Sequence, residues 1–174
     1  YFNYLAHFAD LNQMFLSRFW GYGGSIWGPT DDMASPTGHL HWSITLVIAA
    51  LAVISLIRRK RQTLSLLILG LALLTFIYIF LIHSRSIWFW DNLPLLYYAQ
   101  FPWRLLAIPA LVFSFLAGSL IYFLPKNKYL LPLVTTALIT AVIAWNLPFF
   151  KIEQPVTVTK QEKLSGTLWE LQVT

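Results

Sequence analysis

Four long apolar runs dominate the hydrophobic pattern of this chain. They cover residues 40–57, 64–82, 105–124 and 129–147, and none of them contains an acidic residue, a lysine or an arginine. A helix needs roughly 20 apolar residues to cross a bilayer core of about 30 Å. The pattern therefore predicts four transmembrane helices.

The polar positions between these runs predict an orientation. The connections Arg58-Arg59-Lys60-Arg61 and Lys126-Asn127-Lys128 are basic and fall on the same side of the four predicted helices. Cytoplasmic loops carry an excess of Lys and Arg. We expect a multi-pass protein of the plasma membrane, with residues 58–63 and 125–128 cytoplasmic and residues 1–39, 83–104 and 148–174 extracytoplasmic.

Two further segments on the predicted outer side suit the membrane surface. Residues 1–16 place apolar side chains at helical spacing between polar ones, which predicts an amphipathic helix lying in the interface. Residues 18–33 follow, with four glycines and a proline among aromatic side chains, and they predict a structured loop. Together they form an extracytoplasmic region over residues 1–39.

An aromatic segment joins the second and third runs within residues 83–104. Its core, Trp88 to Arg104, holds only two charged residues, Asp91 and Arg104. Aromatic rings with polar edges favour the boundary between lipid tails and headgroups. The segment therefore lies along the membrane surface, either as a set of anchors alone or as part of a binding site closed by Arg104.

The tail changes to a period of two. Val156 and Val158 alternate with polar residues before a turn region, and Trp169, Leu171 and Val173 alternate after it. This pattern predicts a hairpin that starts an extracytoplasmic β domain in residues 148–174. The predicted fold class is an all-α integral membrane protein of four transmembrane helices with outer interfacial helices, followed by the start of that β domain.

Composition supports the membrane assignment. The chain is 57% hydrophobic and 11% charged, with a mean hydropathy of +0.63, whereas soluble domains are about 45–50% apolar and about 25% charged. The net charge of +5 falls mostly in short connections and in the tail rather than on a water-facing patch. This distribution argues against nucleic-acid binding, and the absence of cysteine excludes a thiolate metal site.

The arginines Arg18, Arg85 and Arg104 lie on the predicted outer side near the membrane surface. Guanidinium groups bind phosphate through paired hydrogen bonds, so these residues are candidates for holding a lipid-linked phosphate or diphosphate. Arg104 follows Phe101-Pro102-Trp103, which sets its approach to the third helix. The alternative is that all three extend to ordinary lipid headgroups.

Two pairs of residues in residues 1–39 could carry other chemistry. The adjacent Asp31 and Asp32 could bind a divalent cation with a phosphate or act as a general base, or they could simply form a solvated turn. His39 and His41 could chelate a metal on an extended backbone but diverge on a helix. For the histidines we expect hydrogen bonding or interfacial placement, and we predict no metal site at this pair.

Three motifs together resemble a known family. They are the segment Trp20 to Ser35 followed by Gly38, the segment Gln100-Phe-Pro-Trp-Arg104 at the start of a span, and the tail segment Lys163 to Glu170. They are similar to large bacterial polytopic proteins of the GT-C-type membrane glycosyltransferase architecture, a group often labelled 6-pyruvoyl-tetrahydropterin-synthase-related membrane proteins. The resemblance covers most of this chain but only the later half of a full family member. We accordingly expect a longer protein with an N-terminal part before Tyr1.

The resemblance implies transfer of a sugar from a polyprenyl-phosphate donor to an extracytoplasmic acceptor. The family's usual catalytic aspartate lies in a first outer loop that precedes this segment, so no residue here inherits that role. Arg104, Trp103 and Arg18 become candidates for binding the donor, with Asp31 and Asp32 as secondary acceptor or metal contacts. The alternative is a non-enzymatic membrane protein that handles or transports cell-envelope lipid or polymer. Conventional transport is disfavoured because the four runs lack the charged residues that usually mark a substrate pathway.

Overall fold

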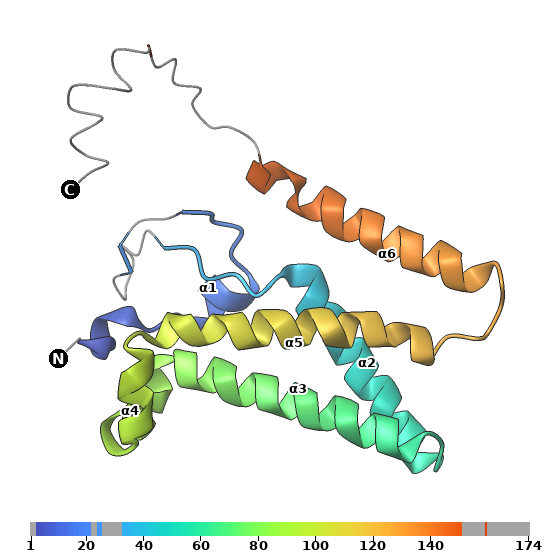
Figure 1. Ribbon diagram of the computed structural model, residues 1–174, viewed down its shortest axis with the longest axis horizontal. Helices are drawn as coiled ribbons and strands as arrows, with labels where there is room; N and C mark the ends of the chain where they lie inside the picture. The colour runs from blue at the N-terminus through green and yellow to red at the C-terminus, as the bar shows by residue number, and fades with distance from the viewer. Residues whose placement is uncertain (1–2, 22–23, 26–32, 151–158, 160–174) are drawn as a thin grey trace. The chain divides into compact units, whose positions relative to one another are not determined.

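The computed structural model describes residues 3–21, 24–25, 33–150 and 159, and its elements in this part of the chain are helical (Figure 1). They comprise α-helices and short 3-10 helices, and the latter are labelled η. In chain order these are η1 (Tyr4–His7), α1 (Leu11–Phe15), α2 (His39–Ile57), α3 (Gln62–Ile82), η2 (Ser84–Ser86), α4 (Ile87–Asn92), η3 (Pro94–Ala99), η4 (Pro102–Leu106), α5 (Ala107–Gly118), η5 (Ser119–Tyr122), α6 (Leu130–Asn146) and η6 (Leu147–Phe150).

Four helices are long and apolar enough to cross a membrane, as the hydrophobic pattern predicts. They extend over His39–Ile57, Gln62–Ile82, Pro102–Tyr122 and Leu130–Phe150. The third and fourth include 3-10 turns, because α5 is preceded by η4 and followed by η5, and α6 is followed by η6. Each observed helix starts within three residues of its predicted start.

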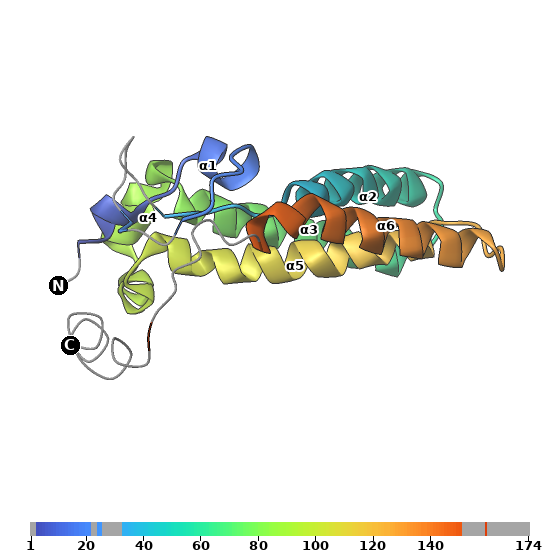
Figure 2. The ribbon, with the colours of Figure 1, turned by 90° about the horizontal axis from the view of Figure 1, so that it is seen from above.

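The helices α2, α3 and α5 pack against one another (Figures 1 and 2). Their shared core consists of fully or almost fully buried aliphatic side chains: Ile48 and Ala52 from α2, Ile68 and Ala72 from α3, and Leu116 from α5. Small residues alternate with larger ones in this core, so the three backbones approach closely. The opposite side of α5 carries Ala110, Ser114 and Gly118, all exposed in the described part of the chain.

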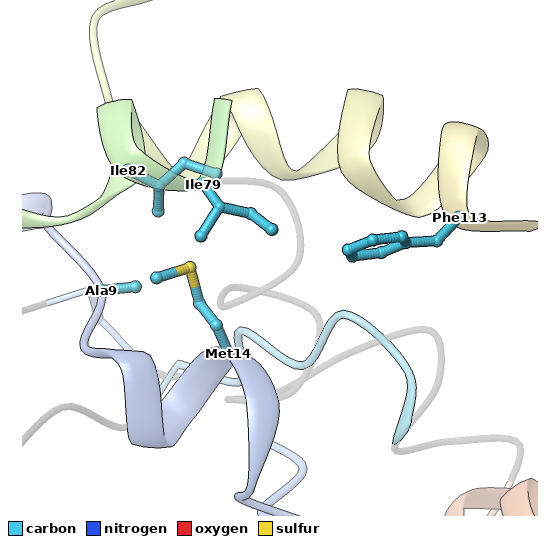
Figure 3. Close-up of a cluster of buried hydrophobic side chains, with 5 residues drawn as sticks. All are labelled: Ala9, Met14, Ile79, Ile82 and Phe113. Atoms are coloured by element: carbon cyan, nitrogen blue, oxygen red, sulfur yellow. The ribbon is translucent and has the colours of Figure 1, made fainter. Parts of the chain in front are cut away.

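A second core lies where α2 begins, α3 ends and α5 begins. It joins Ala9 and Met14 to Ile79 and Ile82 of α3 and Phe113 of α5. Figure 3 shows Met14 pointing from α1 toward Ile79, with Phe113 approaching from α5. We call this end of the packed helices, which holds η1, α1, η2, α4, η3 and η4, the outer end, after its predicted side.

The N-terminal region differs from the prediction. The sequence predicts one amphipathic helix over residues 1–16, whereas the structure has two short helices, η1 and α1. The chain between them is extended at Phe8, which is buried, and the Ala9 backbone N–H donates to the Ile82 carbonyl at 3.1 Å. Asp10 then starts α1 through a capping box with Gln13. The segment breaks because part of its apolar face enters the protein core instead of lipid.

The chain divides into two compact units, residues 1–139 and residues 140–174, and each is described by itself. In the second unit the structure describes the end of α6, η6 and residue 159. The predicted β hairpin lies in residues 151–158 and 160–174, outside the described residues, so the β domain stays a prediction.

Candidate functional site

The outer end gathers three of the residues singled out from the sequence. Arg104 lies in η4 and Arg85 in η2, while Arg18 follows α1. All three side chains are exposed. The packing of Ala9 and Met14 against Ile79 and Ile82 places α1 at the same end as η2 and η4. The three arginines therefore lie at the same end of the packed helices, and their placement on the outer side of a membrane stays a prediction.

Arg104 lies against two aromatic rings. Its guanidinium carbon lies 4.9 Å from the centre of the Phe101 ring and 5.8 Å from that of the Trp103 ring. The two rings are parallel, with 5.8 Å between centroids and 4° between planes. Within the described residues Arg104 forms no ion pair, and its Nη1 donates to the Gln100 side-chain oxygen. The aromatic faces hold the cation by cation–π attraction and leave further N–H donors for a ligand.

The backbone beneath this arrangement is strained at Gln100. Gln100 has φ +63° and ψ −53°, and the Phe101 N–H donates to the Ala99 carbonyl at 2.7 Å. An i to i+2 hydrogen bond with a positive φ is the rare form of the γ-turn. Strain of this kind persists where the surrounding structure maintains it and concentrates at functional sites. Here it occurs at the residue that also holds Arg104.

Trp90 is the structural centre of the aromatic segment, a role that the sequence did not distinguish from that of its neighbours. It is fully buried, and its Nε1 donates to the Leu81 carbonyl at 2.9 Å. Tyr4 stacks on it at 5.4 Å and 23°, and Phe8 meets it edge-on at 6.1 Å and 90°. This ring is therefore covered by protein and fastens η1 to α4.

Tyr4 also hydrogen-bonds across the outer end. Its hydroxyl donates to the Asp91 carboxylate, and the Tyr97 hydroxyl donates to the Asp91 carbonyl at 3.3 Å. The hydrogen bond to Asp91, followed by desolvation, raises the pKa of Tyr4 to about 12. Because Tyr4 and Asp91 are 87 positions apart, no local pattern pairs them. The sequence signal was only that Asp91 is an isolated carboxylate in an aromatic segment.

His7 joins η1 to the Arg104 arrangement. Its ring contacts Phe101 edge-on, with 4.5 Å between centroids. Its Nδ1 is buried and has no hydrogen-bond partner among the described residues. An unpaired buried polar atom costs free energy, so the contact between His7 and the Phe101 ring is made at the expense of a hydrogen bond to Nδ1.

His39, the first residue of α2, is placed as a hydrogen-bonding residue. His39 Nε2 lies 3.0 Å from the Leu16 carbonyl oxygen, and the Trp42 indole donates to the Phe15 carbonyl at 3.2 Å. These bonds attach the segment that carries Arg18 to the start of α2. Gly38, with φ +85°, permits the sharp entry into the helix, and a Cβ there would lie 2.8 Å from His41 Nδ1.

The acidic residues that the structure describes are engaged in structural contacts. Asp31 and Asp32 lie outside the described residues, so their predicted contacts stay predictions. The described part of the chain holds two carboxylates, Asp10 and Asp91. Asp10 starts α1 and Asp91 accepts from Tyr4, so each has a structural role. Among the residues described, no three His, Cys, Asp or Glu side chains cluster as metal ligands would.

Comparison with protein-family models, curated protein sequences and solved structures finds no match to this chain. The family resemblance in the three motifs therefore stays a prediction.

Proposed function

We propose that the protein is a membrane glycosyltransferase-like protein whose outer end binds the phosphate of a polyprenyl-phosphate-linked sugar. The observation that supports this most directly is Arg104, held over parallel Phe101 and Trp103 rings by a residue in a strained γ-turn. A guanidinium fixed at headgroup level with donors to spare suits a phosphate group. The half-buried Trp103 beside it presents an apolar face suited to the polyprenyl chain.

In this proposal the outer-end residues bind rather than catalyse. Asp10 and Asp91 are engaged in structural contacts, so the general base would come from a part of the protein outside the described residues. Arg18, attached to α2 through the segment Phe15–Leu16, is a secondary phosphate contact. Asp31 and Asp32 stay candidates for acceptor or metal contacts.

The alternative is a non-enzymatic protein that binds or transports envelope lipid or polymer. The engagement of both described carboxylates favours it, because a general base that activates the acceptor must lie near it. Both proposals share the phosphate contact and differ in whether sugar is transferred. A transfer assay on the full-length protein, with labelled polyprenyl-phosphate sugar, separates them.

Binding is tested with the full-length protein in nanodiscs and a polyprenyl-phosphate sugar as the probe. Hydrogen bonds to charged groups contribute about 1.5–3 kcal/mol, so we expect Arg104→Ala to weaken binding by about tenfold to a hundredfold. Arg104→Lys should recover only part of that affinity, because lysine lacks the planar fork. Arg85→Ala removes an exposed arginine from the same end and should leave binding unchanged.

Equal losses in Arg104→Ala and Arg85→Ala would show that only general surface charge matters. No binding by the wild type would reject the donor site. Transfer of sugar would support the enzyme, and binding without transfer would support the alternative.

A further inference from the structure

A cavity at the opposite end of the helices has no place in the proposed function. It has a volume of about 460 Å³, within the range of about 300–1,000 Å³ that is usual for small-ligand sites. Its walls come from the connection before α3, from the end of η5 and from the loop that leads into α6. We call it the basic cavity.

The lining of the basic cavity has two chemical parts. Arg61, Lys126 and Lys128 supply three cations, while Ile121, Leu124 and Leu131 supply aliphatic surface. Arg61 lies 65 positions before Lys126 in the chain. The two basic connections therefore lie at the same end of the helices, as the predicted orientation requires.

The backbone holds these cations in place. Arg61 adopts φ +46° and ψ +43°, a left-handed conformation that costs a non-glycine residue free energy, and its carbonyl accepts from the Ser65 N–H at 3.0 Å to begin α3. On the facing loop, the Asn127 side chain accepts from the Tyr129 and Leu130 N–H groups at 2.9 Å and 3.2 Å. The Lys128 ammonium lies 4.8 Å above the Tyr129 ring. The cationic wall is thus built by two anchored turns.

No carboxylate neutralises this wall in the described part of the chain. The two carboxylates described there, Asp10 and Asp91, both belong to the outer end. Three cations beside an aliphatic surface at the level of a bilayer's headgroups complement a phosphate with an attached acyl chain. Basic pockets of this kind between transmembrane helices bind anionic headgroups on the cytoplasmic side.

We propose that the basic cavity is a binding site for an anionic phospholipid, with its phosphate among Arg61, Lys126 and Lys128 and its glycerol and first acyl carbons against Ile121, Leu124 and Leu131. The site lies at the end of the helices opposite Arg104.

The test uses the full-length protein in detergent, with thermal unfolding and native mass spectrometry as readouts. Phosphatidylglycerol and phosphatidylcholine with the same acyl chains are the lipid probes, while glycerol 3-phosphate and inorganic phosphate test the headgroup alone. The cavity variant is Arg61→Gln/Lys126→Gln/Lys128→Gln. The control, Arg58→Gln/Arg59→Gln/Lys60→Gln, removes the same charge from the same end without altering the cavity lining.

We expect phosphatidylglycerol to stabilise the wild type and the control and to stay bound in the mass spectrometer, whereas phosphatidylcholine does neither. Each cation near an anionic membrane surface accounts for about fivefold in affinity, so the cavity variant should bind phosphatidylglycerol roughly a hundredfold more weakly. A topology reporter checks that both variants insert as the wild type does. The single variant Arg61→Gln, with an expected loss of about fivefold, serves if the triple variant fails to insert.

Three outcomes would overturn the proposal. Equal losses of phosphatidylglycerol affinity in the cavity variant and the control would show that net charge alone accounts for binding. Equal responses to the two lipids would remove the anionic preference. Stabilisation by inorganic phosphate or glycerol 3-phosphate as large as that by phosphatidylglycerol would assign the cavity to a soluble phosphate instead of a lipid.

Discussion

The strain at Gln100 leads to a prediction about the order of stability among variants. Gln100→Ala and Gln100→Gly both remove the amide that accepts from Arg104, so the difference between them reports the backbone alone. At a negative φ, glycine is less stable than alanine by roughly 0.5–1 kcal/mol. At φ +63° a Cβ is penalised by about 1–2 kcal/mol. We therefore expect the order to invert, with Gln100→Gly more stable than Gln100→Ala by about 0.5–1 kcal/mol.

The measurement is equilibrium unfolding of the full-length protein in mixed micelles, followed by tryptophan fluorescence. Ala99→Gly is the matched control, because Ala99 is the first residue of the turn, lies in η3 and has no positive φ. In that control the free energy of unfolding should fall by roughly 0.5–1 kcal/mol. A Gln100→Gly variant less stable than Gln100→Ala would refute the strain argument.

The same pair also tests the role of the turn in binding. Both variants free the Arg104 guanidinium from Gln100, so both should weaken binding of the polyprenyl-phosphate sugar although their stabilities differ. If binding followed stability instead, the turn would have only a structural role.

Three other predictions concern single contacts. Because the pKa of Tyr4 is raised to about 12, the Tyr4–Asp91 hydrogen bond contributes stability that is fully present below about pH 10 and is lost as the pH rises toward about 12. In an absorbance titration at 295 nm, Tyr4→Phe should remove the tyrosine ionisation step near pH 12, and an unchanged step would contradict the assignment. Gly38→Ala should lower the free energy of unfolding by about 1–2 kcal/mol, because the positive φ disfavours a Cβ that would also lie 2.8 Å from His41 Nδ1. An unchanged free energy of unfolding would show that the start of α2 adjusts. Ser65→Ala should stabilise the protein by about 1 kcal/mol, since the buried Ser65 hydroxyl has no hydrogen-bond partner in the described part; a loss of stability would point to a partner that the described residues do not supply.

The hydrophobic pattern alone was enough to locate the four long helices. An apolar run of about 20 residues is a local property, and a bilayer accepts it only as a helix that satisfies its own backbone. The predicted and observed limits agree closely, for example 40–57 against His39–Ile57. The grouping of Arg18, Arg85 and Arg104 at one end follows from the same alternation of spans.

Local patterns were less reliable where the chain leaves the spans. Helical spacing in residues 1–16 predicted one surface helix, yet Phe8 and Ala9 are buried and divide it. Periodicity identifies an apolar face but does not say whether lipid or protein covers that face. In the same way Trp90 is buried while Trp88 is 65% exposed, although both belong to one aromatic run.

The sequence by itself determined the membrane class and the number and limits of the spans, because these depend on the hydropathy of consecutive residues. Only the tertiary structure decided which distant residues meet: Tyr4 with Asp91, His7 with Phe101, and Arg61 with Lys126 around the basic cavity. Such contacts depend on how helices pack and how the turns between them bend. The strained backbone at Gln100 belongs to this second group, because hydrogen bonding and packing around a turn can impose a φ that the residue's own preference disfavours.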